Sequence, residues 1–128
     1  MALRDQLRVM VVDDMSTSRG LITQALDAFG ITNVASTADG ASAVHSMQNN
    51  PVHLVISDYN MPNMDGLQLL HHLRSHPKTK GVGFILITGR AEKSIIDHGK
   101  QLGMNNFLKK PFEPNDLRAC IEAVVGRL

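Results

Sequence analysis

Short apolar runs alternate along the chain with longer stretches whose apolar residues recur at helical spacing. The short runs are Val9–Val12, Asn33–Ser36, His53–Ser57, Gly83–Thr88 and Asn106–Lys109. A run that is apolar at nearly every position is typical of a strand buried on both faces of a parallel sheet. Strands that alternate with helices indicate right-handed crossovers, with helices on both faces of the sheet. The pattern therefore predicts an α/β fold of three layers with five parallel strands.

The first helical stretch follows Asp13-Asp14. Ser16 or Thr17 is expected to cap this helix, because a side-chain hydroxyl can accept a hydrogen bond from a free amide of the first turn. Gly30 is expected to end it. Its predicted apolar face comprises Leu21, Ile22, Ala25, Leu26 and Phe29.

The later helices carry end signals of their own. Asp39 and Asp65 are expected to cap the second and third helices, and Pro114 suits the first position of the fifth. The fourth helix is predicted over Ala91–Leu102 and contains Gly99, which costs about 1 kcal/mol relative to Ala in a helix interior. We therefore expect the fourth helix to be the softest element of the fold.

The composition is that of one ordinary soluble domain. The chain has 128 residues, a hydrophobic fraction of 43% and a formal net charge of +1, so bulk charge predicts neither a nucleic-acid nor a membrane partner. Cys120 is the only cysteine and lies on the apolar stripe of the last helix, which suits a core residue in a reducing compartment. No apolar run is long enough for a signal peptide or a membrane span. We expect a single domain over residues 1–128 that is monomeric and cytoplasmic.

Acidic residues follow two of the predicted strands. Asp13 and Asp14 come directly after the first run, and Asp58 comes directly after the third. In a flavodoxin-like doubly wound sheet, with strand order 2-1-3-4-5, the first and third strands are neighbours at the switch point where ligands bind. That order places the three carboxylates at the carboxyl ends of the strands, here called the rim of the sheet, with Thr88 and Lys110 at the ends of neighbouring strands.

The chemistry of this rim follows from its charges. Three carboxylates at short range repel one another, and a divalent cation with hard oxygen ligands, magnesium or alternatively manganese, removes the conflict. An ionised Asp58 can act as a nucleophile toward phosphorus and form an aspartyl phosphate. Lys110 supplies a positive charge and Thr88 a hydroxyl donor for phosphoryl oxygens. The expected chemistry is phosphoryl transfer to Asp58, with Asp13 and Asp14 holding the metal.

These motifs occur together and in order. They are Asp13-Asp14, Asp58 followed by Asn60-Met61-Pro62 and Asp65-Gly66, Thr88, and Lys110-Pro111-Phe112. The chain resembles the receiver domains of two-component response regulators, and among them the CheY-like chemotaxis receivers that stand alone without an output domain. The resemblance implies phosphorylation of Asp58 by a CheA-like histidine kinase. It also implies magnesium held by Asp14, Asp58 and the backbone carbonyl of Asn60, with Asp13 acting through water, and a cis bond between Lys110 and Pro111.

The resemblance further implies a switch and a target. Phosphorylation is expected to draw Thr88 inward, and an aromatic residue of the fifth strand is expected to fill the vacated space. The outer face then changes to bind a flagellar motor switch protein or another protein target. The aromatic position, commonly Tyr in chemotaxis receivers, is Phe107 here, which can move in the same way but offers no hydroxyl to a partner. Arg90 is expected to flank the mouth of the site and to pair with the phosphoryl group or screen water.

Other functions share parts of this pattern. A phosphate sink that drains the kinase, or an adaptor for a non-motor target, would carry the same site, and the sequence does not separate either from a motor-binding switch. A phosphohydrolase with an aspartyl-phosphate intermediate would resemble Asp-x-Asp, whereas Asp13 and Asp14 are adjacent. An electron carrier of the flavodoxin type would hold an FMN phosphate in the first loop, where these carboxylates would repel it. We therefore expect no enzyme activity beyond phosphotransfer to the chain itself and autodephosphorylation.

Overall fold

Five parallel strands form the centre of the molecule. The computed structural model describes residues 2–90 and 92–128. The strands are β1 (Arg8–Val12), β2 (Asn33–Thr37), β3 (Leu54–Asp58), β4 (Gly83–Thr88) and β5 (Asn106–Lys109). They pair in the order β2-β1-β3-β4-β5, and every pairing is parallel. The predicted strand order is confirmed.

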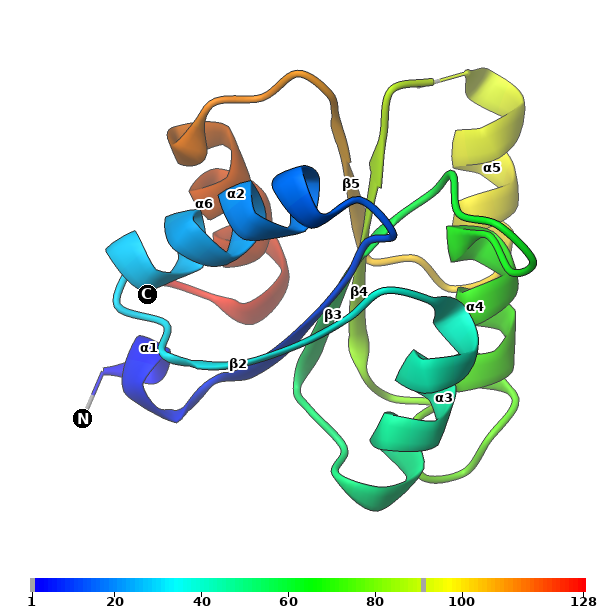
Figure 1. Cartoon of the computed structure of the whole chain (residues 1–128), viewed down its shortest axis with the longest axis horizontal. Helices are drawn as coiled ribbons and strands as arrows, with labels where there is room; N and C mark the ends of the chain where they lie inside the picture. The colour runs from blue at the N-terminus through cyan, green and yellow to red at the C-terminus, as the bar shows by residue number, and fades with distance from the viewer. Residues whose placement is uncertain (1, 91) are drawn as a thin grey trace.

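Helices cover both faces of this sheet. They are α1 (Leu3–Gln6), α2 (Ser16–Ala28), α3 (Gly40–Asn49), α4 (Gly66–Arg74), α5 (Lys93–Gln101) and α6 (Pro114–Val125). Figure 1 shows α2 and α6 on one side of the sheet and α3, α4 and α5 on the other. The predicted three-layer sandwich is therefore confirmed. No helix among the described residues is both long enough and apolar enough to cross a membrane.

The sheet has a separate hydrophobic core on each face. Along β1, Met10 and Val12 pack with the residues of α3, α4 and α5, whereas Val9 and Val11 pack with those of α2 and α6. Successive side chains of a strand point to opposite faces, so a strand covered on both sides is apolar at every position. This arrangement is the physical reason for the uninterrupted apolar runs in the sequence.

Most of the predicted helix ends are confirmed. The Asp39 carboxylate caps α3 by accepting a hydrogen bond of 2.7 Å from the amide three residues ahead. Asp65 caps α4 in a reciprocal pair with Gln68, in which each side chain accepts from the backbone amide of the other residue at 2.9 Å. Pro114 occupies the first turn of α6, and Gly30 takes the left-handed conformation after α2, with φ of 85°.

The beginning of α2 differs from the prediction. Met15 occupies the N-cap position without a side-chain hydrogen bond, and Ser16 is already helical, so the expected cap by Ser16 or Thr17 is wrong. The helix begins at Ser16, directly after the loop that carries Asp13 and Asp14, and therefore at least one residue earlier than a cap by Ser16 or Thr17 would allow. Leu21 is also not part of the buried face, because 63% of it is exposed. The short α1 was not predicted, and the predicted start of the fourth helix at Ala91 lies outside the described residues.

Gly99 has a packing role in α5. It is buried together with Ile95 and Ile96. A Cβ added at Gly99 would lie 2.8 Å from the sulfur of Met104 and 3.4 Å from Cδ2 of Leu67. The absence of a side chain therefore leaves room for the Met104 side chain against α5. The softness expected of this helix stays a prediction.

Arg74 ties the end of α4 to the turn between α5 and β5. Its guanidinium donates to the backbone oxygen of Gly103 at 2.9 and 3.3 Å, to that of Lys80 at 3.0 Å and to Oδ1 of Asn105 at 3.1 Å. The same Oδ1 accepts a hydrogen bond of 2.8 Å from the amide of Phe84, at the start of β4. Partial burial lowers the pKa of Arg74. One side chain thus joins the end of α4 to the segments that precede β4 and β5, at the opposite end of the strands from the acidic residues.

Candidate functional site

The ends of β1 and β3 bring the acidic residues together. β1 and β3 are adjacent and pair in register up to Val12 and Ser57, so the residues that follow lie side by side. Asp13, Asp14 and Asp58 each place a carboxylate oxygen within 4.8 Å of the others. Asp13 and Asp58 are buried, whereas Asp14 is exposed. The predicted cluster of three carboxylates is confirmed as a geometric arrangement.

Asp13 is held by its backbone as well as by its side chain. Its amide donates to the backbone oxygen of Thr37 at 3.1 Å, and its own backbone oxygen accepts from the Arg19 guanidinium at 2.7 Å. Oδ1 accepts from the amide of Met15 at 3.0 Å. Oδ2 is buried without a hydrogen-bond partner among the described residues, and the Lys110 ammonium is 3.9 Å from it. A buried carboxylate oxygen in this state is costly unless another group supplies charge.

Asp58 has two distinguishable oxygens. The Lys110 ammonium lies 3.1 Å from Oδ1, and the Tyr59 amide donates to the same Oδ1 at 3.1 Å. Oδ2 is not engaged by either donor. Burial raises the pKa of Asp58, while the hydrogen bond and the charge of Lys110 lower it and Asp13 raises it further. The net direction is upward, so ionised Asp58 is at a disadvantage in this site.

The donor set fits a small divalent cation. Three carboxylates within 4.8 Å, one with a buried oxygen that lacks a hydrogen bond among the described residues, match the hard oxygen ligands that magnesium prefers. A bound cation would also offset the burial and the repulsion by Asp13 that together raise the pKa of Asp58. Asn60 lies two residues beyond Asp58 with an exposed side chain. Its role as a ligand through the backbone carbonyl stays a prediction.

Thr88 ends β4 on the same rim, but its hydroxyl is engaged elsewhere. The hydroxyl donates to the backbone oxygen of Arg90 at 3.2 Å and accepts from the Arg90 amide at 2.9 Å. The backbone oxygen of Thr88 accepts from the Lys110 amide at 2.8 Å, which joins the ends of β4 and β5. The Arg90 guanidinium pairs with Glu92 at 2.9 Å, and both side chains are largely exposed. Thr88 therefore holds the turn that leads to α5.

Phe107 is half-buried in β5. It packs against the core on the α3, α4 and α5 face. Its backbone oxygen accepts a long hydrogen bond of 3.6 Å from the Cys120 thiol in α6. Burial raises the pKa of Cys120 to about 11, so the thiol is protonated at neutral pH, as expected of a core cysteine. The part of Phe107 in a switch stays a prediction.

The turn after Asp58 needs a glycine. The Gly66 amide donates to the backbone oxygen of Tyr59 at 2.9 Å, which folds the loop back on β3. A Cβ at Gly66 would lie 2.5 Å from the backbone oxygen of Asp58 and 2.7 Å from Cδ1 of Leu86. Asn63 takes a left-handed conformation in this loop, with φ of 68°. The loop thus presses on the strand end that presents Asp58.

Ser18 belongs to the site although the sequence did not single it out. The Lys110 ammonium lies 3.3 Å from its Oγ. Ser16, Thr17 and Ser18 offer three hydroxyls in succession, and no local pattern indicates which of them faces a lysine 92 residues later. The Lys110–Pro111 peptide bond is cis, as the resemblance implied.

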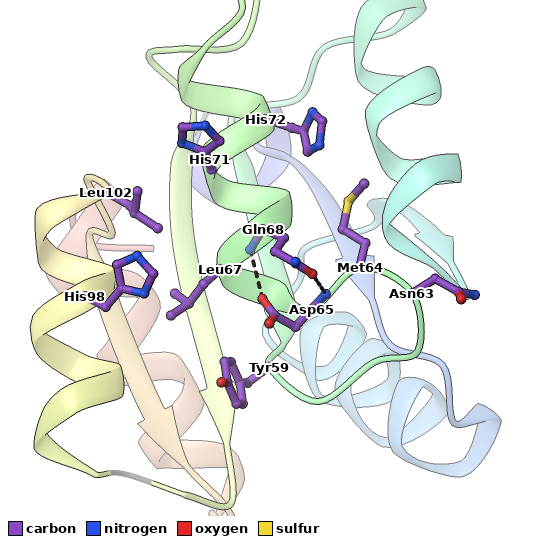
Figure 2. Close-up of a pocket in the computed structure, with 10 residues that line it drawn as sticks. All are labelled: Tyr59, Asn63, Met64, Asp65, Leu67, Gln68, His71, His72, His98 and Leu102. Carbon is purple, nitrogen blue, oxygen red and sulfur yellow. Dashed lines mark hydrogen bonds between the residues drawn. The ribbon is translucent and has the colours of Figure 1, made fainter.

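Two hollows flank the site. An apolar groove of about 620 Å³, here called the α2 groove, has walls that include Met15, Leu21, Ala25, Lys110, Pro111 and Phe112. Met15 and Leu21 are 60% and 63% exposed. A second cavity of about 660 Å³ lies beside α4 and α5, and Figure 2 shows the residues that line it, among them Tyr59, Leu67, His98 and the hydrogen-bonded pair of Asp65 and Gln68.

Comparison with known proteins places this geometry in a family. A model of the response regulator receiver domain matches residues 9–122. The chain belongs to this receiver family. Receivers of the CheY-like type are signalling switches, and the chemistry that they catalyse is limited to their own phosphorylation state.

Individual relatives and structures support the assignment. A probable chemotaxis protein CheY from Rhizobium etli is 41% identical over all of this chain and 99% of the relative. The crystal structure of chemotaxis protein CheY4 from Vibrio cholerae is similar with a TM-score of 0.88 and 28% identity, covering 93% of this chain and 98% of that one. The receiver domain of a sensor histidine kinase from Pseudomonas aeruginosa, with magnesium coordinated in its active-site cleft, has a TM-score of 0.85 and 26% identity, covering 94% and 98%.

Proposed function

We propose that this chain is a phosphorylation-activated switch of a two-component chemotaxis system in the cytoplasm. It accepts a phosphoryl group on Asp58 from a CheA-like histidine kinase and then binds a protein target. The observation that carries this proposal is the buried Asp58, which is paired with Lys110 at 3.1 Å inside a cluster of three carboxylates. The relation to chemotaxis proteins over the whole chain supports the signalling context.

The residues of the site have separate roles in the transfer. Oδ2 of Asp58 is the oxygen that Lys110 and the Tyr59 amide leave open, so it is the proposed nucleophile. Its lone pair forms the new bond to phosphorus while the bond between phosphorus and the donor imidazole nitrogen breaks, and that nitrogen keeps the electron pair. The Lys110 ammonium stabilises negative charge on the phosphoryl oxygens.

The proposed cofactor is magnesium. When bound, it neutralises the charge of the carboxylates and of the transferring phosphoryl group. Asp13 and Asp14, together with Asp58 and the backbone carbonyl of Asn60, are the proposed residues that hold it. The magnesium-bound receiver from Pseudomonas aeruginosa supports this assignment.

The proposed signal leaves the site through Thr88. Its hydroxyl bonds to the turn at Arg90 in this structure. A phosphoryl group on Asp58 offers a stronger, charged acceptor for the Thr88 proton. Transfer of that bond releases the turn before α5, and Phe107 takes up the space behind Thr88. The outer surface of α5 and β5 thereby differs between the two states.

The α2 groove is the proposed docking site for the phosphodonor domain of the kinase. Lys110 lines the groove and its ammonium contacts Asp58, so the groove adjoins the acidic site. Met15 and Leu21 are large apolar residues that are more than half exposed. An apolar helix face that covers them would carry its histidine to Asp58.

The proposed target is the flagellar motor switch protein, and an adaptor role toward another target or a phosphate sink remains the alternative. A pull-down of the phosphorylated protein with motor switch protein, together with the dephosphorylation half-life, distinguishes these roles. Binding to the switch protein with a long-lived phosphoryl group supports the motor role. Rapid dephosphorylation without binding supports the sink.

Labelling with acetyl phosphate and magnesium tests the proposed function. Wild type should take up label, and Asp58→Asn should take up none. Asp65→Asn removes the same charge from a helix cap in the next loop and is the matched control. Label that persists in Asp58→Asn, or amide spectra between residues 92 and 107 that do not respond to beryllofluoride with magnesium, would contradict the proposal.

A further inference from the structure

The Lys110 ammonium has one neutral hydrogen-bond partner, Ser18, besides the carboxylates of Asp58 and of Asp13, whose Oδ2 lies 3.9 Å away. Nζ lies 3.1 Å from Oδ1 of Asp58 and 3.3 Å from Oγ of Ser18, and 30% of the side chain is exposed. An ammonium group can only donate hydrogen bonds, whereas a hydroxyl oxygen can accept them, so Lys110 donates to Ser18. The bond joins the first turn of α2 to the end of β5.

Ser18 is held in place by the loop that carries the acidic residues. The guanidinium of the neighbouring Arg19 donates to the backbone oxygen of Asp13 at 2.7 Å. The Arg19 amide donates to the backbone oxygen of Met15 at 2.9 Å. These bonds fix the first turn of α2 relative to Asp13. The Ser18 hydroxyl is carried on one rotatable bond from this fixed backbone, whereas the four-carbon stem of Lys110 gives its ammonium many rotamers.

We propose that Ser18 is a positioning residue that keeps the Lys110 ammonium in the site while negative charge passes from Asp58 to the phosphoryl oxygens. This inference rests on the proposed function. The carboxylate of Asp58 attracts the ammonium only as long as it is ionised, and that charge changes when the acyl phosphate forms. The bond to Ser18 is independent of the state of Asp58. The bond to Ser18 therefore limits the positions that the ammonium can adopt and keeps it close to the incoming phosphoryl group.

A matched pair of variants tests this role. Thr and Val have the same shape, but only Thr keeps the hydroxyl. Ser18→Val is expected to lower the rate constant of labelling by acetyl phosphate at least about tenfold, as for a lost hydrogen bond to a charged group, whereas Ser18→Thr retains most of the wild-type rate. In a Lys110→Met background the two variants are expected to label equally slowly, because Ser18 acts through the ammonium.

The ammonium group is also observable without phosphorylation. Its signal in a lysine-selective proton–nitrogen spectrum is assigned by its loss in Lys110→Arg. We expect this signal in wild type and in Ser18→Thr, and a signal broadened by exchange with water in Ser18→Val. Ser18→Ala, which adds no atoms, gives the same comparison against wild type if the larger side chains disturb folding in thermal melts.

The outcomes separate the two proposals. Equal rates and equal ammonium signals with and without the hydroxyl overturn the role of Ser18, as does a rate loss in Ser18→Val that persists in the Lys110→Met background. If wild type takes up no label but its ammonium signal depends on Ser18, the proposed function fails and the positioning of Lys110 stands.

Discussion

The ammonium of Lys110 lies 3.1 Å from Oδ1 of Asp58, although their strands are not neighbours in the sheet. β4 separates β5 from β3, so the contact passes over the end of β4. The four-carbon stem of Lys110 spans this gap from a backbone whose amide donates to Thr88 at 2.8 Å. The contact between Lys110 and Asp58, together with the Lys110 amide bond to Thr88, therefore links the ends of β3, β4 and β5.

The charge of Asp58 is expected to lower the stability of the metal-free protein. Folding raises the pKa of Asp58 above 3.8, so the folded state favours the protonated carboxyl. The free energy of unfolding is therefore highest, as far as Asp58 is concerned, below about pH 3.8, and it falls as the pH rises through the pKa of the folded state. Asp58→Asn should therefore be more stable than wild type at pH 7 in a chelator, by a margin that shrinks toward pH 4. Urea denaturation at several pH values measures this margin.

Magnesium provides the control for that experiment. An ion that binds only the native state adds about 2.7 kcal/mol of stability at a concentration one hundred times its dissociation constant. Saturating magnesium should stabilise wild type more than Asp58→Asn and so reduce or reverse the difference. A difference that does not depend on pH or on magnesium would contradict this account of Asp58.

Gly66→Ala is expected to destabilise the fold and to displace Asp58. The added Cβ would lie 2.5 Å from the backbone oxygen of Asp58, and backbone atoms cannot turn aside as a flexible side chain does. We expect a loss of about 1–3 kcal/mol in the free energy of unfolding, as for overpacked cores. Gly20→Ala is the control, since an added Cβ there meets nothing within 4 Å and should stabilise α2 by up to about 1 kcal/mol. Equal effects of the two substitutions would refute the argument.

Arg74→Met is expected to loosen the turn before β5. The substitution keeps an apolar stem but removes the bonds to Gly103, Lys80 and Asn105. Loss of these charged hydrogen bonds should cost about 1.5–3 kcal/mol of stability. Arg90→Met removes only an exposed pair with Glu92 and should cost less than about 1 kcal/mol. Hydrogen exchange should accelerate at the turn in Arg74→Met and remain unchanged there in Arg90→Met.

Leu21→Glu is expected to impair transfer from the kinase but not from a small donor. A charge in the α2 groove opposes an apolar partner, so the rate of phosphotransfer from the kinase should fall at least about tenfold. Acetyl phosphate needs no docking surface and should label the variant at the wild-type rate. Gln24→Glu changes an exposed residue of the same helix and is the control. Parallel losses with both donors would show that Leu21 acts on the site itself.

Local signals predicted most of the fold. Asp39, Asp65 and Gly30 act through neighbours within a few residues, so their roles are readable from the sequence. The strands are readable because both faces are covered. The cluster of Asp13, Asp14 and Asp58 required in addition the strand order, which follows from general rules for parallel sheets.

The features that sequence reasoning missed depend on distant partners. Leu21 has the spacing of a buried residue but lines a groove together with Phe112, which is far along the chain. Ser18 is one hydroxyl among several until the position of Lys110 is known. Gly99 reads as a weak point of a helix, and only the positions of Met104 and Leu67 show its packing role. Local propensity carries no information about such contacts.

The two bonds of Thr88 have a consequence for how the proposed switch encodes a signal. A hydroxyl carries one proton, and Thr88 donates it to the backbone oxygen of Arg90 in this structure. That proton cannot at the same time serve a phosphoryl oxygen, so each molecule holds one arrangement or the other. A stronger stimulus then enlarges the number of molecules in the second arrangement and leaves each molecule's output unchanged. The size of the cellular response would then depend on how many receiver molecules are in the second arrangement, because each molecule has only two output states.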